Sequence, residues 1–122
     1  MLLKDKFYKV LGENKTDGNN AVFHCALLAD CDVYRGHFPH KPVSPGVCNI
    51  EMIKECVMLL TGKKLVIKTI KQCRLTAVAS PAVCPEVDVT VAVTPCEGGY
   101  NVVARIADAQ TSYMEYKGEM AL

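Results

Sequence analysis

The feature that most constrains the fold is a segment of 15 residues, 47–61, that is apolar on nearly every side. Its sequence, VCNIEMIKECVMLLT, allows about four turns of helix and is followed by Gly62, a residue typical of helix C-termini. At about 100° per residue, the hydrophobic side chains spread around most of the circumference, while Glu51, Lys54 and Glu55 share one arc of about 100°. The sequence therefore predicts a helix that other elements enclose, with its polar arc facing either solvent or a cavity.

The remaining apolar runs have the short, alternating or β-branched pattern of strands. Two of them, residues 5–12 and 21–29, precede the helix and are separated by the turn-rich ENKTDGNN. Four follow it: KLVIKTIKQCRLTAV, EVDVTVAVT, GYNVVARIA and TSYMEYKGEMAL. Short connections favour antiparallel neighbours. We therefore expect an α+β domain in which an antiparallel β-sheet is wrapped around one long central helix.

Length and composition restrict the number of domains and the class of partner. At 122 residues the chain is expected to form a single domain, residues 1–122, and its net charge of +1 gives no bias toward nucleic acid. Seven cysteines without a CxxC pair, mostly within apolar runs, are typical of reduced and buried thiols, which predicts a cytoplasmic protein. Neither a signal peptide nor a run long enough to span a membrane is evident, so we expect no membrane association.

A loop of unusual composition leads into the predicted helix. Residues 36–46, GHFPHKPVSPG, contain two histidines, three prolines and two glycines. Each proline restricts its own backbone and that of the preceding residue, so the loop is expected to hold His37 in one place.

Together with Glu51, this loop resembles the signature of the 3-hydroxyacyl-(acyl carrier protein) dehydratases of fatty acid synthesis, which have the hotdog fold. The matching positions, with the family's spacing, are His37, Phe38, Pro39, Pro42, Pro45, Gly46, Val47 and Glu51. The resemblance implies a homodimer with shared active sites, in which His37 of one subunit faces Glu51 of the other, and higher oligomers remain open. It also implies a substrate carried on the phosphopantetheine arm of acyl carrier protein, with no metal and no other cofactor.

The chemistry of that family suits these residue types. Dehydration of a 3-hydroxyacyl thioester needs a base for the proton at C2 and an acid for the hydroxyl at C3. The unperturbed pKa of histidine makes His37 a suitable base, and Glu51 is a suitable acid if burial raises its pKa. The backbone N–H of Gly46 would stabilise negative charge on the thioester oxygen. The residues expected to bind substrate are Phe38, Pro45, Gly46 and Val47.

Three positions depart from the family pattern. His40 replaces a glycine, Ser44 replaces a larger apolar residue, and Glu55 stands where many members carry glutamine one turn after the acid. A second acid beside Glu51 would raise the pKa of Glu51 further by repulsion, or would direct the helix to different chemistry. Glu51 could instead simply pair with Lys54 on a solvated face.

Two other functions are compatible with the same fold: a hotdog acyl thioesterase and a non-catalytic acyl-thioester-binding protein. The joint presence of His37 and Glu51 favours the dehydratase over both. The basic residues of segment 63–74 either dock an acidic carrier protein or form an ordinary solvated strand face. No Gly-rich phosphate loop and no zinc-ligand spacing is recognisable, and no aromatic residues interleave the lysines as a nucleic-acid surface would require.

Overall fold

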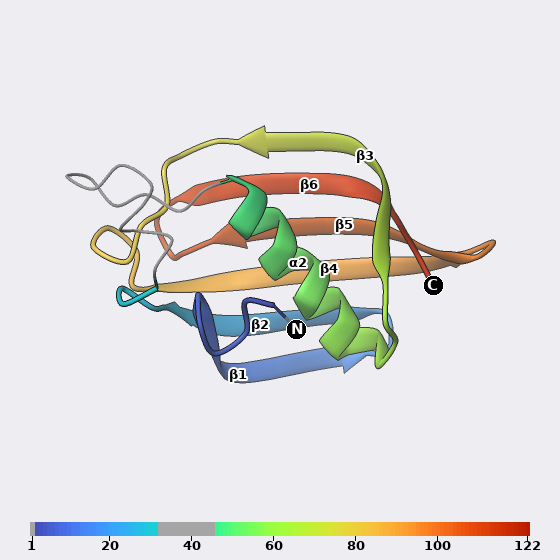
Figure 1. The fold of residues 1–122 in the computed structure, drawn as a ribbon, viewed down its shortest axis with the longest axis horizontal. Helices are drawn as coiled ribbons and strands as arrows, with labels where there is room; N and C mark the ends of the chain where they lie inside the picture. The colour runs from blue at the N-terminus through green and yellow to red at the C-terminus, as the bar shows by residue number, and fades with distance from the viewer. Residues whose placement is uncertain (1, 32–45) are drawn as a thin grey trace.

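The computed structural model describes residues 2–31 and 46–122, in which one helix lies against a six-stranded antiparallel sheet (Figure 1). The sheet order is β1-β2-β4-β5-β6-β3. In chain order the elements are β1 (Tyr8–Asp17), β2 (Asn20–Leu27), α2 (Gly46–Thr61), β3 (Val66–Leu75), β4 (Glu86–Cys96), β5 (Gly99–Ala107) and β6 (Ser112–Ala121).

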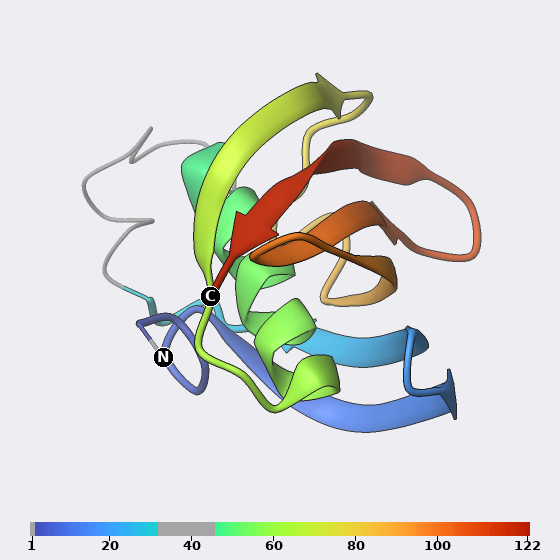
Figure 2. The same ribbon diagram turned by 90° about the vertical axis from the view of Figure 1, so that its right-hand side faces the viewer.

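The helix α2 is enclosed by the curved sheet, as the apolar segment predicts. Figure 2 shows the strands arranged in an arc around it. Its side chains Met52, Ile53, Cys56 and Val57 are buried against the inner face of the sheet, to which β4 contributes alternate valines at 87, 89, 91 and 93. Alternation places these valines on one face, because successive strand side chains point to opposite sides.

The bounds of α2 agree with the prediction within one residue, but the helix is short rather than long, with 16 residues. Its length is fixed by its ends. Pro45 precedes it in the sequence, and Gly62 ends it with a φ of 69° while its N–H donates to the Met58 carbonyl at 2.8 Å. Within the described residues, no helix has the length and apolarity needed to span a membrane.

The first strand extends further than the sequence predicts. The expected turn, ENKTDGNN, is largely strand: β1 continues to Asp17, with Glu13 opposite Phe23 and Lys15 opposite Ala21 on β2. These polar residues are tolerated because β1 is an edge strand whose side chains are mostly exposed. The turn itself is confined to the end of the segment, where the Asp17 carboxylate accepts a hydrogen bond from the Asn19 N–H at 2.7 Å.

The other edge strand, β3, departs from simple alternation through two bulges. Lys68 and Lys71 are bulge residues with no opposite residue on β6. As a result, side chains three residues apart lie opposite inward-facing positions of β6: Ile67, Ile70 and Cys73. Both lysines extend toward the same Glu119 carboxylate, at 3.9 Å and 3.3 Å.

Gly118 on β6 is required by the close approach of β3. A Cβ atom at this position would collide with the Thr69 carbonyl oxygen and come within 3.1 Å of the Tyr116 hydroxyl. We expect Gly118→Ala to lower the free energy of unfolding by about 1–3 kcal/mol, because backbone has to move to make room. Chemical denaturation measures this change.

Gly12→Ala on β1 is the matched control, since nothing lies within 4 Å of a Cβ atom there. Its effect should stay within about 0.5 kcal/mol. Equal effects for the two substitutions would contradict the close approach of β3 to Gly118.

Candidate functional site

The residues expected to form the active site fall partly within the described structure. His37, Phe38 and Pro45 lie in residues 32–45, outside the described residues, and their roles stay predictions. Gly46 and Val47 open α2, where backbone N–H groups have no partner within the helix. The Val47 side chain is 75% exposed.

Glu51 lies one turn further along α2 and lines a cavity of about 300 Å³. The cavity is bounded by α2, the N-terminal segment and the start of β3. Its lining residues are Leu2, Glu51, Lys54, Glu55, Met58, Lys64, Leu65 and Val66. The polar arc of the helix therefore faces a cavity, which is one of the two environments that the sequence allows.

The environment of Glu51 favours its protonated form. Burial raises the pKa of this carboxyl, and a hydrogen bond with Glu55 adds to the effect. Lys54 opposes both, because its Nζ lies 3.3 Å from Glu51 Oε1 and stabilises the charged form. The net direction is upward, so Glu51 keeps its proton to a higher pH than an ordinary glutamate, as a general acid requires.

Glu55 is a fully buried carboxylate, and sequence reasoning missed its environment. Its oxygens accept hydrogen bonds from the Leu3 N–H at 3.0 Å, the Lys4 N–H at 2.9 Å and the Tyr8 hydroxyl at 3.0 Å. Burial alone would raise the pKa of Glu55, but these bonds and the one from Glu51 outweigh burial and hold its pKa below the usual value. No local signal predicts this, because the donors lie about 50 residues earlier in the chain.

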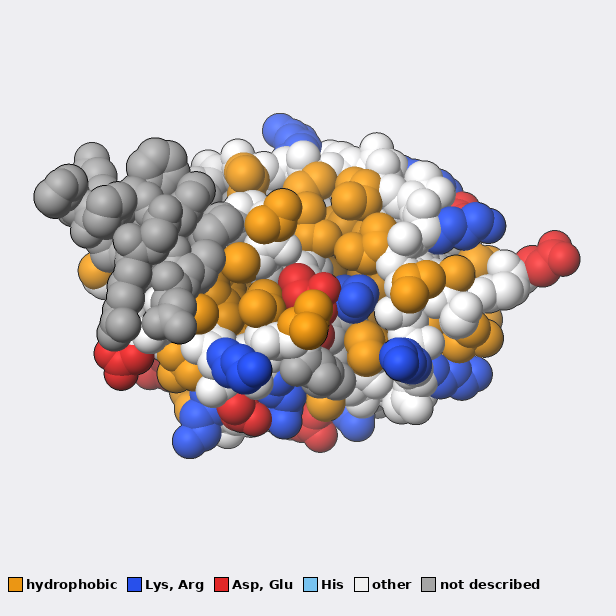
Figure 3. Space-filling view, in the orientation of Figure 1, with side chains coloured by type: hydrophobic (Ala, Val, Ile, Leu, Met, Phe, Trp, Pro, Cys, Tyr) orange, Lys and Arg blue, Asp and Glu red, His pale blue; other side chains and the backbone are white. Residues whose placement is uncertain are grey.

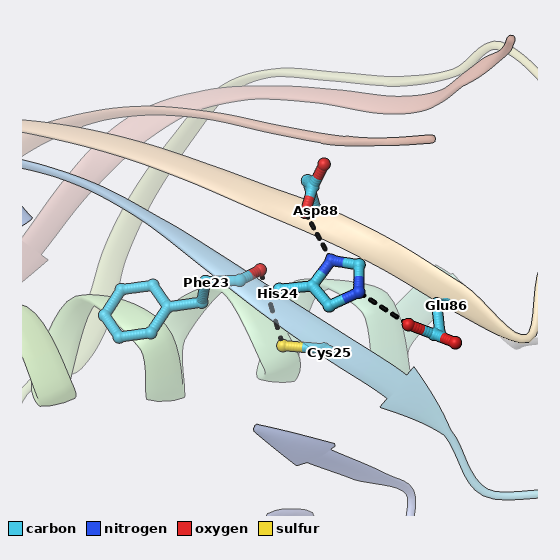
Figure 4. A network of polar contacts seen from close by, with 5 residues as sticks. All are labelled: Phe23, His24, Cys25, Glu86 and Asp88. Atoms are coloured by element: carbon cyan, nitrogen blue, oxygen red, sulfur yellow. Dashed lines mark hydrogen bonds and ion pairs between the residues drawn. The ribbon is translucent and has the colours of Figure 1, made fainter. Parts of the chain in front are cut away.

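A second polar cluster lies on the outer face of the sheet (Figure 4). His24 on β2 is held between two carboxylates of β4: its Nδ1 lies 2.7 Å from Asp88 Oδ1 and its Nε2 lies 2.6 Å from Glu86 Oε1. Hydrogen bonds to Asp88 and Glu86 raise the pKa of His24, since the imidazolium can donate from both nitrogens. The neighbouring Cys25 points to the opposite face and is buried.

Part of the basic segment after the helix is paired with carboxylates of β6. Lys68 and Lys71 pair with Glu119, and Arg74 Nη1 lies 3.9 Å from Glu115 Oε2. Lys63 Nζ lies 5.8 Å from the centre of the Tyr100 ring. These contacts favour the solvated strand face over a free cationic strip. Among the described side chains, no three His, Cys, Asp or Glu residues are placed to hold a metal ion.

Comparison with known proteins identifies relatives of the chain. The ApeI-like family model, described as ApeI dehydratase, matches residues 13–113. The dehydratase heterocomplex ApeI:P from Xenorhabdus doucetiae has a similar structure, with a TM-score of 0.79 and 16% identity over 93% of this chain and 97% of that chain. An uncharacterized protein from Erwinia carotovora subsp. atroseptica is also similar, with a TM-score of 0.67 and 14% identity over 93% of this chain and 94% of the other. No curated protein matches.

At these identities the structural likeness shows the fold alone. It confirms the expected hotdog-like architecture, an antiparallel sheet with one helix against it.

The His24 cluster generates a prediction about pH. A histidine whose pKa is raised by folding stabilises the protein fully below its unfolded pKa, near 6.5, and loses that contribution as pH rises through the folded value. His24→Gln should therefore lower the free energy of unfolding more at about pH 5.5 than at about pH 9. Denaturation of both proteins at the two pH values measures the difference.

Asp88→Asn provides the control for this comparison, because the bond to Asp88 is the largest cause of the shift. In that background the pH dependence of the His24→Gln effect should shrink. An effect of His24→Gln that is the same at both pH values would contradict the prediction.

Proposed function

Because the chain belongs to the ApeI-like family, described as ApeI dehydratase, we propose that it removes water from 3-hydroxyacyl thioesters to give trans-2-enoyl thioesters. The observation that carries this proposal is the family match, which spans both His37 and Glu51. We further propose that the acyl group is presented on acyl carrier protein. The likeness of residues 36–51 to the signature of the 3-hydroxyacyl-(acyl carrier protein) dehydratases supports that carrier.

In the proposed reaction His37 is the base and Glu51 is the acid. His37 takes the proton from C2, and the electron pair of that bond forms the C2–C3 double bond as the C3–O bond breaks. Glu51 donates its proton to the departing hydroxyl, which leaves as water. The raised pKa of Glu51 supports this role, because it keeps the proton on the carboxyl to a higher pH than in an ordinary glutamate. The N–H of Gly46 stabilises the charge that develops on the thioester oxygen.

The cavity beside Glu51 supports an acyl substrate. Leu2, Met58, Leu65 and Val66 contribute apolar wall around the carboxyl group, so that an alkyl chain and the reacting C3 hydroxyl could share one small volume. The remaining proposed contacts are made by Phe38, Pro45, Gly46 and Val47.

We propose that the active form is a homodimer whose two active sites are shared. Figure 3 shows hydrophobic side chains gathered on the face that α2 occupies in Figure 1. Val47, Ile70 and Leu75 contribute to the exposed apolar surface of α2 and β3, with exposures of 75%, 45% and 60%. A second copy would cover it and bring His37 to the partner's acid. A different chain is the alternative occupant, since the similar structure from Xenorhabdus doucetiae is a heterocomplex.

The catalytic proposal predicts that His37→Ala and Glu51→Gln each lower dehydration by about 100-fold or more, because each removes one of the two proton-transfer groups. Mass spectrometry of a 3-hydroxyacyl carrier protein detects the loss of one water. His24→Ala is the matched control, because this histidine lies on the outer face of the sheet and should leave the rate unchanged.

The same assay separates the alternatives. Release of a free acid by the wild-type protein would indicate a thioesterase. An acyl carrier protein that is bound but chemically unchanged would indicate a non-catalytic binding protein. Full activity in a correctly folded His37→Ala variant would contradict the assignment of the base.

The dimer generates a separate prediction. Ile70→Lys should convert the dimer to a monomer and reduce dehydration with it, because a buried unpaired charge opposes association. Sedimentation velocity measures the mass in solution. Val103→Lys introduces the same side chain at a position with 51% exposure on the outer face of β5 and should leave the mass unchanged. A dimer that persists in Ile70→Lys would contradict this interface.

A further inference from the structure

We propose that Glu55 is a positioning residue for the dehydration: a buried carboxylate, fixed by the N-terminal segment, that holds the Glu51 carboxyl in place through a hydrogen bond. The inference rests on the proposed role of Glu51 as the acid. It adds a residue that does not touch the substrate's reacting atoms and acts only through Glu51.

The first observation is that the Glu55 side chain is built to carry a charge. It has no exposed surface, yet both oxygens are bonded: Oε2 to the Leu3 N–H, and Oε1 to the Lys4 N–H and the Tyr8 hydroxyl. All three groups are donors, and a neutral carboxyl would leave at least one of them poorly satisfied. A carboxylate that accepts two or three such bonds stays ionised even when it is buried.

The second observation is that these donors are held rigidly. The Lys6 and Phe7 N–H groups both donate to the Leu3 carbonyl, at 3.0 Å and 2.8 Å, which closes a tight turn. Phe7 and Tyr8 are fully buried and anchor the turn to the core. Burial also raises the pKa of Tyr8, with Cys56 and Glu55 adding to the effect, so that the hydroxyl remains a donor throughout the working pH range.

The third observation is the relation between the two glutamates. They are four residues apart on α2 and therefore neighbours on one face of the helix. Two adjacent carboxyls do not ionise independently, and the one with better donors keeps the charge. Glu55 has three donors besides Glu51, and both glutamates line the same cavity. The proposed hydrogen bond therefore runs from a protonated Glu51 to Glu55, which agrees with the raised pKa of Glu51 and the lowered pKa of Glu55.

Among residues 2–31 and 46–122, few other charged and titratable groups lie around the pair. Lys54 and Lys64 line the same cavity, and Lys54 favours the ionised form of Glu51. Tyr8 donates to Glu55, while the thiols of Cys48 and Cys56 lie near Glu51 and Glu55 respectively. Glu55 and Lys54 thus act on Glu51 in opposite directions.

Glu55→Gln tests the proposal through the pH profile of the reaction. Removing the negative charge and half of the acceptor capacity should let Glu51 lose its proton at a lower pH. The alkaline limb of kcat should therefore move to lower pH by about one unit, which is about a tenfold loss of the acid form on that limb. A purely structural role for Glu55 would lower stability without moving this limb. Glu97→Gln, at an exposed turn between β4 and β5, makes the same chemical change and should leave the profile unmoved.

Carbon-13 NMR titration of the glutamate carboxyls gives a readout that does not depend on catalysis. In the wild-type protein, Glu51 should take up its proton at a higher pH than Glu55, and in Glu55→Gln the Glu51 titration should move to lower pH. An unchanged Glu51 titration in Glu55→Gln, or protonation of Glu55 before Glu51 in the wild type, would overturn the proposal. The wild-type measurement stands even if the variant fails to fold.

These results also separate the inference from the proposed function. If the Glu51 titration moves as expected while the wild-type protein dehydrates no thioester, the coupling of the two carboxyls is supported and the proposed function is overturned. If the protein dehydrates its substrate and the titration does not move, Glu55 has no positioning role.

Discussion

The enclosure of α2 by the sheet is the interaction on which the rest of the structure depends. Met52, Ile53, Cys56 and Val57 are almost completely buried, and each apolar side chain removed from water contributes about 1.5–3 kcal/mol. A flat sheet would bury only one side of a helix that is apolar on most sides. The sheet therefore has to curve around α2 to bury the other apolar side chains. The polar arc with Glu51 and Glu55 faces the N-terminal segment and the start of β3, and the cavity forms between them.

The buried charge of Glu55 imposes a second requirement, on the start of the chain. A carboxylate with no exposed surface must find donors within the protein. The turn that starts at Leu3 supplies them, and Asp5 adopts a φ of 66° there, in the left-handed region that non-glycine residues rarely occupy. The conformational energy of this backbone is offset by the hydrogen bonds that the Leu3 and Lys4 N–H groups donate to Glu55. The conformation of the first residues is thus tied to the electrostatics of the helix.

The sequence predicts those parts of the fold that depend on local pattern and misses those that depend on pairing. The apolar run and the Pro and Gly at its ends define α2 almost to the residue. The same reasoning ends β1 too early. A polar edge strand has the composition of a turn, and only its pairing with β2 identifies it as a strand. It also treats β3 as an alternating strand, whereas IKTIKQ has a period of three that reflects two bulges.

Only the part of the candidate site on α2 can be compared with the sequence prediction, because His37 lies outside the described residues. Motif spacing singles out His37 and Glu51, and the position of Glu51 in a cavity agrees with its proposed role. The sequence indicates that a second acid lies beside Glu51, but not that Glu55 is buried and hydrogen-bonded, because Leu3, Lys4 and Tyr8 reach it only through the tertiary fold. The His24 cluster is not predicted from the sequence for the same reason. Its carboxylates lie on β4, and only the register between β2 and β4 brings them close to His24.

The bulges of β3 have a consequence for how related sequences should be aligned. Lys68 and Lys71 are surplus to the ladder, so deleting either one would straighten the strand without turning an inward side chain outward. Deleting a residue within β4 would instead reverse the facing of every valine beyond it, since strand side chains alternate strictly. Gaps and insertions among relatives therefore belong at the two lysines of β3, while the length of β4 should be constant.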